Sequence, residues 1–226
     1  MKRAAVLLLC AFLLSIVPAV GQEFAQIKTD HSICSAVFII DTYFTAKHCV
    51  TNPAVESAIV TDVYSSGVTS DHYVGHVHTL DGIDVAMMGN NERATSRGGM
   101  TSGDGTWGSL VSKYLYSADT RFSLGRYVVI HCSGHPELPP IAGVIYDRRV
   151  TYKDTTKEQT SLMVKTLDGE VIPGCSGSAV MDVSTGKLIG IVWGGSSDNS
   201  SAAITSVDEI KEALGIPVTT TVSTKR

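Results

Sequence analysis

The apolar residues of this chain come in short runs rather than in the stripes of long helices. The runs are rich in Val, Ile and Tyr, and Gly, Ser, Asp and Asn separate them. Many short strands divided by turn residues are typical of an all-β sandwich or barrel. We therefore predict strands at residues 35–40, 56–64, 73–79, 84–88, 127–131, 141–146, 161–166, 178–181 and 188–193.

One helix is predicted near the end of the chain, at residues 206–215. Ser206 and Glu209 have the spacing of a capping box, in which each side chain accepts a hydrogen bond from a backbone N–H of the other residue. Gly215 can end the helix. The apolar residues of this segment share one helix face: Val207, Ile210 and Leu214. Residues 217–226 are mostly Thr, Ser and Val, and we expect a frayed tail there.

Residues 1–21 have the layout of a secretory signal peptide. Lys2 and Arg3 precede an apolar run at residues 4–17, and small residues stand one and three positions back from a cut after Gly21. The alternative is an uncleaved anchor helix, because the run is close to the length that spans a bilayer. With cleavage, we expect a secreted protein, extracellular or periplasmic, without stable membrane association.

The charge balance argues against a nucleic-acid partner. Removing residues 1–21 leaves 205 of the 226 residues, which fits one β domain. The removed segment carries two positive charges and no negative ones, so the formal net charge changes from −4 to −6. A mildly acidic chain without clusters of Lys and Arg lacks the electrostatic footprint of a nucleic-acid-binding protein.

Four cysteines remain after the signal peptide: Cys34, Cys49, Cys132 and Cys175. An even number in a secreted chain predicts two disulfides, and three pairings are possible. No Cys-x-x-Cys or His/Cys ligand spacing occurs, so we expect neither a metal site nor a cofactor. His76 and His78 form the only His-x-His, and we interpret them as structural.

Two motifs carry the candidate chemistry. Residues 45–49 read Thr-Ala-Lys-His-Cys and place His48 shortly after an apolar run. Residues 174–178 read Gly-Cys-Ser-Gly-Ser and place Ser176 in a glycine-flanked turn that can expose its hydroxyl. A serine hydroxyl is a poor nucleophile unless a base removes its proton, so Ser176 needs a histidine elsewhere in the fold.

In this order, the two motifs resemble those of the chymotrypsin-like serine peptidases of the compact bacterial and viral type. In that family Thr-Ala-Ala-His-Cys carries the base and Gly-Asp-Ser-Gly-Gly the nucleophile. The resemblance extends over about residues 33–214. It implies that residues 22–226 form one trypsin-like serine peptidase domain, with two six-stranded antiparallel β-barrels and a C-terminal α-helix. The barrels would lie at about 22–90 and 121–205, joined by a glycine-rich crossover at about 91–120.

The resemblance also indicates the other catalytic parts. Residues 84–88, Asp-Val-Ala-Met-Met, are similar to the family's Asp-Ile-Ala-Leu-Leu, so Asp84 is the candidate acid that orients His48. Three other aspartates compete for this role: Asp62, Asp71 and Asp81. Only Asp84 is followed directly by apolar strand residues. The backbone N–H groups of Gly174 and Ser176 are the implied oxyanion donors.

A candidate substrate pocket follows from two further segments. Residues 190–194, Gly-Ile-Val-Trp-Gly, are similar to the family's Gly-Ile-Val-Ser-Trp-Gly, so Trp193 and Gly194 are candidate pocket residues, although no serine precedes the tryptophan here. Glu170 stands six residues before Ser176, where trypsin-like members carry an acid that selects Arg or Lys. The cysteine expected two positions later is Ile172, and a solvent-facing turn at 167–170 is the alternative.

The resemblance implies a Cys34–Cys49 disulfide, because the family pairs the cysteine beside the catalytic histidine with one a strand earlier. A Cys132–Cys175 bridge would then pin the oxyanion turn, and two unpaired buried cysteines are the alternative. The activating Ile-Val-Gly-Gly start of animal members is absent, and Cys175 replaces its aspartate partner. We therefore expect no maturation by insertion of a new N-terminus.

The resulting expectation is a monomeric secreted serine endopeptidase that acts on peptide or protein substrates through an acyl-enzyme on Ser176. The runner-up is a catalytically silent homologue that serves as a binding or adhesion module, favoured by the missing serine before Trp193. An α/β-hydrolase esterase is a third, weaker reading. That fold places the histidine last in the chain, whereas the last histidine here is His135.

Overall fold

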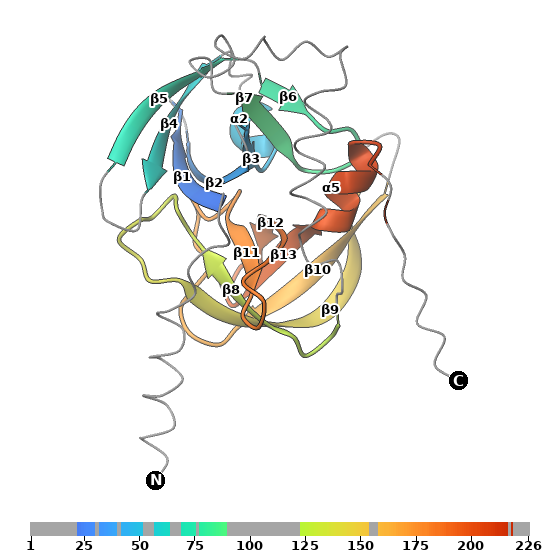
Figure 1. Cartoon of the computed structure of the whole chain (residues 1–226). Coiled ribbons are helices and arrows are strands. Elements are labelled where there is room, and N and C mark those ends of the chain that lie inside the picture. The colour runs from blue at the N-terminus through green and yellow to red at the C-terminus, as the bar shows by residue number, and fades with distance from the viewer. Residues whose placement is uncertain are drawn as a thin grey trace.

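The computed structural model describes residues 22–29, 32–39, 42–51, 57–63, 69–75, 77–89, 123–153, 158–216 and 218. The predicted signal peptide, the crossover, His76 and nearly all of the predicted tail lie outside the described residues. Figure 1 shows two β units, one above the other, with a short helix beside the place where they meet.

The first half is one antiparallel sheet. In the described residues it has seven strands in the order β5-β4-β1-β2-β3-β7-β6. Its strands are β1 (Gln22–Lys28), β2 (Ile33–Ile39), β3 (Thr42–Thr45), β4 (Ser57–Val63), β5 (Thr69–Gly75), β6 (Val77–Thr79) and β7 (Ala86–Gly89). A closed six-stranded barrel was expected here. The structure instead has an open sheet, in which β1 lies between β2 and β4.

The second half is a closed barrel, as expected. Its six described strands follow the order β10-β13-β12-β11-β8-β9, and the ring closes because β9 pairs with both β8 and β10. The strands are β8 (Tyr127–His131), β9 (Ile141–Lys153), β10 (Glu158–Thr166), β11 (Ala179–Asp182), β12 (Leu188–Gly195) and β13 (Ser201–Ser206).

Every predicted strand range overlaps a strand of the structure, and three strands were not predicted. The missed strands are β1, β3 and β13. β3 has only four residues, too few to show an alternation. β13 is fully buried and consists mostly of Ser, Ala and Thr, so it lacks the Val- and Ile-rich signature used for prediction.

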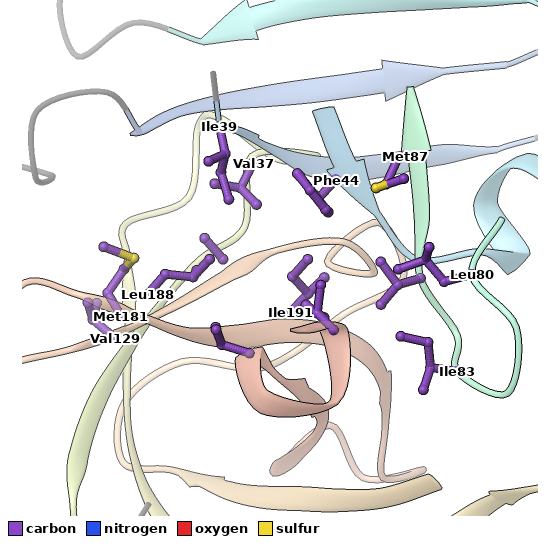
Figure 2. Close-up of a cluster of buried hydrophobic side chains, with 14 residues drawn as sticks. Val37, Ile39, Phe44, Leu80, Ile83, Met87, Val129, Met181, Leu188 and Ile191 are labelled. Atoms are coloured by element: carbon purple, nitrogen blue, oxygen red, sulfur yellow. The ribbon is translucent and has the colours of Figure 1, made fainter. Parts of the chain in front are cut away.

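The two halves share a hydrophobic core. In Figure 2, Val37, Phe44 and Met87 of the first sheet lie opposite Met181 and Leu188 of the barrel, all in one buried cluster. Two further clusters fill the first sheet and the inside of the barrel separately. Because apolar burial stabilises by about 25 cal/mol per Å², the shared cluster holds the two β units against each other.

The predicted C-terminal helix is present as α5 (Val207–Ala213). Its capping box is confirmed: the Ser206 N–H donates to Glu209 Oε2 at 2.8 Å, and the Glu209 N–H donates to Ser206 Oγ at 3.3 Å. Val207 and Ile210 belong to the shared core, and Gly215 follows the helix at φ +69°. The helix therefore packs against the junction of the two halves (Figure 1).

Candidate active site

Strand pairing in the first sheet brings His48 and Asp84 together. Thr45, the last residue of β3, pairs with Ala86, the first residue of β7. Because the two strands are antiparallel, the segment that follows Thr45 and the segment that precedes Ala86 lie at the same end of the sheet. His48 begins the short helix α2 (His48–Thr51) in the first segment, and Asp84 ends a turn in the second.

The carboxylate of Asp84 holds His48 at two points. His48 Nδ1 lies 2.6 Å from Asp84 Oδ2, and the His48 backbone N–H donates to Asp84 Oδ1 at 3.0 Å. The Asp84 side chain is 6% exposed and the His48 side chain 48% exposed. Because a carboxylate oxygen accepts, Nδ1 carries the hydrogen, and Nε2 is left as the basic nitrogen. The arrangement therefore fixes one tautomer of a solvent-facing imidazole.

Ser176 lies in a turn that precedes β11, and glycines shape this turn. Gly174 has φ +103° and Gly177 has φ +89°, both in the region that side chains with a Cβ rarely adopt. At Gly177 a Cβ would lie well under 3.0 Å from the carbonyl oxygen of Ser35 and the hydroxyl of Thr45. The turn therefore needs glycine for its backbone conformation and for its close approach to the first sheet.

Ser35 of β2 connects the turn to the half that carries His48. Its N–H donates to the carbonyl of Ser176 at 2.7 Å, and its Oγ donates to the carbonyl of Gly174 at 3.0 Å. The preceding residue, Cys34, forms a disulfide with Cys49, which follows His48. The Ser176 turn and the start of α2 are therefore tied to the same strand.

Both predicted disulfides are present. Cys34 and Cys49 are joined across a Cα separation of 6.3 Å, and Cys132 and Cys175 across 4.8 Å. Cys175 directly precedes Ser176 and is fully buried, while Cys132 follows the end of β8. The alternative of two unpaired cysteines at 132 and 175 is therefore not what the structure contains. Each disulfide fixes the neighbour of one candidate catalytic residue.

Two backbone donors of this turn are unpaired. Among the described residues, no acceptor contacts the N–H of Gly174 or that of Ser176. Three carbonyls around them accept hydrogen bonds from outside the turn: Pro173 O accepts from His135, and the carbonyls of Gly174 and Ser176 accept from Ser35. Unpaired backbone N–H groups are rare in folded proteins, so this pair can accommodate an oxygen that carries negative charge.

The Ser176 hydroxyl makes no hydrogen bond to His48 within the part of the chain that the structure describes. Catalytic hydrogen bonds are often long or poorly aligned without substrate and tighten when it binds. The shared attachment through Ser35 and the Cys34–Cys49 bridge places the two residues on adjoining segments. The Ser176 hydroxyl, the oriented imidazole of His48 and the two N–H donors are therefore candidate parts of one site.

The candidate pocket residues have different surroundings. Glu170 is exposed at the end of the 167–170 turn. Trp193 is the extra residue of a β-bulge between Val192 and Gly194, and its indole N–H donates to Ser161 Oγ at 2.9 Å. A Cβ at Gly194 would meet no atom within 4 Å, so this glycine borders open space. A role of these three residues in substrate selection stays a prediction.

Sequence reasoning did not assign a role to Ser35 or to His135. Ser35 was only the first residue of an apolar run, yet it is fully buried and makes three of the hydrogen bonds that hold the turns around Ser176. The available signal was a serine inside an apolar strand, because a buried hydroxyl requires partners. His135 entered the sequence analysis only as the last histidine of the chain.

Two other features, a membrane-spanning helix and a cluster of metal ligands, are absent from the described residues. No helix among them is long and apolar enough to cross a bilayer. Within the same ranges, no group of three or more His, Cys, Asp and Glu residues could hold a metal ion.

Several solved structures have the same fold as this chain. The chain is similar to the active form of the Rv3671c protease from M. tuberculosis, with 16% identity, a TM-score of 0.61, and coverage of 89% of this chain and 83% of that chain. It is also similar to Deg5, with 13% identity, a TM-score of 0.58, and coverage of 89% and 91%. The MamO protease domain from Magnetospirillum magneticum matches at 12% identity and a TM-score of 0.57, covering 84% of this chain and 94% of that one. At these identities the likeness shows the fold.

No curated protein sequence matches the chain. A family model does: the trypsin-like peptidase domain matches residues 34–191. The match spans well over half of the chain and includes His48, Asp84 and Ser176. This chain therefore belongs to the family of trypsin-like peptidases.

Proposed function

We propose that the protein is a secreted serine endopeptidase that cleaves peptide bonds through an acyl-enzyme on Ser176. The observation that carries this proposal is the His48–Asp84 pair, at 2.6 Å, on a segment that adjoins the turn of Ser176. The unpaired N–H groups of Gly174 and Ser176 supply the remaining part that acyl transfer requires. Family membership indicates peptides or proteins as the substrates.

In the first half of the proposed reaction, His48 Nε2 takes the proton from Ser176 Oγ while the oxygen attacks the carbonyl carbon of the substrate. The N–H groups of Gly174 and Ser176 donate to the oxyanion of the tetrahedral intermediate. Asp84 keeps the ring in the correct tautomer and stabilises the imidazolium through the Nδ1–H. The imidazolium then gives its proton to the leaving amine, the C–N bond breaks, and the acyl group stays on Ser176.

The second half repeats these steps with water. His48 removes a proton from a water molecule while the water oxygen attacks the acyl carbon. The N–H groups of Gly174 and Ser176 donate to the second oxyanion. Collapse of this intermediate breaks the bond to Ser176 Oγ, which recovers its proton from His48. The enzyme returns to its starting state and the acid product leaves, so no external cofactor enters the balance.

The proposal is tested by hydrolysis of fluorescently labelled casein by the oxidised protein that starts at Gln22. We expect activity in the wild type and only residual rates in Ser176→Ala, His48→Ala and the double variant. The three losses should be equal, because nucleophile and base act as a unit. Ser123→Ala and His78→Ala are the matched controls, since both side chains are exposed. An inactive wild type would favour a silent binding or adhesion module of this fold instead.

Secretion is part of the proposal. Two disulfides fit an oxidising compartment. A cut after Gly21 would leave all of β1 (Gln22–Lys28) in the mature protein, where this strand pairs with β2 and β4. We expect N-terminal sequencing of active secreted material to find a start near residue 22, with activity present as soon as the chain is folded and oxidised. Activity that requires a further cut downstream would contradict this part.

A further inference from the structure

The peptide unit between Pro173 and Gly174 carries one of the two unpaired N–H groups. The N–H of this peptide unit belongs to Gly174 and its carbonyl oxygen to Pro173. In a planar trans peptide the N–H and the C=O point in opposite directions. Whatever holds the carbonyl of Pro173 therefore also sets the direction of the Gly174 N–H.

A side chain outside the proposed triad holds that carbonyl. His135 Nε2 lies 2.8 Å from Pro173 O, and a carbonyl oxygen only accepts, so Nε2 donates its hydrogen. Within the described residues this is the only hydrogen bond to Pro173 O. We propose that His135 is a positioning residue of the peptidase: it holds the Pro173–Gly174 peptide so that the Gly174 N–H points to the oxyanion. This inference rests on the proposed function.

The neighbouring peptides of the turn are secured in other ways. Ser35 donates hydrogen bonds to the carbonyls of Gly174 and Ser176, and the disulfide to Cys132 fixes Cys175. The Pro173–Gly174 peptide lies at the centre of a turn that the Cys175 N–H closes by donating to the carbonyl of Ile172 at 3.1 Å, and in the described residues only His135 bonds to this central peptide itself. Its second residue is a glycine at φ +103°, and glycine changes its backbone conformation at a lower steric cost than any other residue. Because the central peptide of such a turn can rotate while the closing hydrogen bond is kept, the bond from His135 acts directly on its orientation.

The His135 ring is itself held in place. Its Nδ1 lies 3.1 Å from Glu137 Oε1, and its backbone N–H donates to the carbonyl of Cys132 at 3.0 Å. The ring also lies against the turn, since a Cβ at Gly174 would be 2.6 Å from Nε2. These contacts keep residue 135 beside the peptide, and its side chain remains 27% exposed. Because the side chain is partly exposed and outside the core clusters, we expect a substitution here to leave the core intact.

Two substitutions of His135 distinguish the effect of the hydrogen bond to Pro173 O from the effect of having a polar side chain at this position. The amide nitrogen of Gln lies as many bonds from Cα as Nε2 of His, whereas the amide nitrogen of Asn lies one bond closer. We expect His135→Gln to reach Pro173 O and His135→Asn to fall short of it. The pair therefore keeps the functional group and changes only its reach. His78→Ala, at an exposed histidine on β6, controls for the loss of an imidazole.

The first measurement is steady-state hydrolysis of one peptide chosen from the cleavage sites in casein. Removing an oxyanion donor altogether costs about 10²–10³ in kcat. Since His135 only orients such a donor, we expect His135→Ala and His135→Asn to lower kcat by roughly 10- to 100-fold. KM should stay within about threefold, and His135→Gln should recover most of kcat. The affinity for the aldehyde of the same peptide, which forms a hemiacetal oxyanion, should fall in step with kcat.

Equal kcat values for His135→Asn and His135→Gln would overturn the inference, as would a His135→Ala enzyme within about twofold of the wild type. A crystal structure of His135→Ala gives a readout that does not depend on turnover. We expect the Pro173 carbonyl to have rotated toward Ser176, and an unrotated peptide would overturn the inference. If the wild type hydrolyses nothing while the peptide rotates in the variant, the proposed function fails and the positioning role stands.

Discussion

The two halves of the molecule hold their candidate catalytic residues by different means. In the first sheet a buried side chain acts directly, because the Asp84 carboxylate accepts from both the ring and the backbone of His48. In the second barrel the backbone shape positions Ser176, through glycines at positive φ and contacts from Ser35. The base should therefore respond to changes of charge and hydrogen bonding, and the nucleophile turn to changes of volume and cross-linking.

The largest effect is expected at the base. Asp84→Asn keeps the size of the side chain. Its amide NH2 group can donate where the carboxylate accepted, so it no longer favours the His48 tautomer with hydrogen on Nδ1. We expect kcat to fall by about 10⁴-fold, equivalent to about 5.5 kcal/mol of transition-state stabilisation. The free energy of unfolding should change by less than about 2 kcal/mol, because the hydrogen bond from the His48 backbone can remain. Steady-state kinetics and urea unfolding measure the two quantities. If Asp84→Asn kept more than a tenth of the wild-type kcat, the claim that the Asp84 carboxylate positions the base would be wrong.

The second largest effect concerns cross-linking of the nucleophile turn. On the chain-entropy estimate, a disulfide over a separation of 43 residues stabilises by about 4 kcal/mol, so replacing Cys132 and Cys175 by Ala should lower the unfolding free energy by that amount. The matched change at Cys34 and Cys49, over 15 residues, should cost about 3 kcal/mol. Urea unfolding of both variants provides the test. A smaller loss at Cys132 and Cys175 than at Cys34 and Cys49 would contradict the expected order.

The third largest effect is expected from adding volume to the Ser176 turn at Gly177. Gly177→Ala places a Cβ against the carbonyl of Ser35 in a backbone conformation that already disfavours it, and we expect a loss of about 3 kcal/mol in unfolding free energy. Gly125→Ala is the control, because Gly125 also has a positive φ, +83°, but its Cβ would meet no atom within 4 Å. That variant should lose only about 1 kcal/mol. Equal losses would mean that backbone conformation, and not the close approach to Ser35, governs this position.

The smallest effect lies where the two halves meet. The ring of His131 stacks on Phe24 of the first sheet with centroids 4.2 Å apart, and burial lowers the pKa of His131 from 6.5 to about 4. Between these values the unfolded chain binds a proton that the folded chain does not. The free energy of unfolding should therefore fall by about 2 to 3 kcal/mol as the pH drops from 6.5 to 4.

His131→Phe keeps an aromatic ring for the stack and removes the titration. Urea unfolding at several pH values should show a flatter pH dependence in this variant than in the wild type. Parallel curves for the two proteins would show that His131 does not report on the contact between the halves.

The sequence was sufficient for the parts of the site that lie in local motifs. The family resemblance and the apolar strand that follows singled out Asp84 as the candidate acid, and the same resemblance implied both disulfide pairings, which the structure contains. The roles of Ser35 and His135 could not be found in this way. The Ser35–Gly174 hydrogen bond spans 139 residues, and neither residue belongs to a pattern that predicts the contact.

The fold shows the same division. The barrel strands with Val and Ile runs were predicted, and β8 matches at both ends. β1 was missed because its sequence mixes Gln, Glu and Lys with the buried residues Ala25 and Ile27. The expected closed barrel is an open sheet in the described residues. β1 is a strand there because it pairs with β2 and, at longer range, with β4. Long-range strand pairing is a tertiary effect that local propensity does not encode.

The central claim is that Ser176 is a nucleophile activated by His48, and covalent labelling tests it most directly. The oxidised protein starting at Gln22 is treated with a fluorophosphonate probe, and the labelled peptide is located by mass spectrometry. The account predicts one adduct per chain, on Ser176, with labelling abolished in Ser176→Ala and strongly slowed in His48→Ala. Ser123→Ala should label like the wild type. Full labelling of Ser176→Ala, or an adduct on any other residue, would contradict the account.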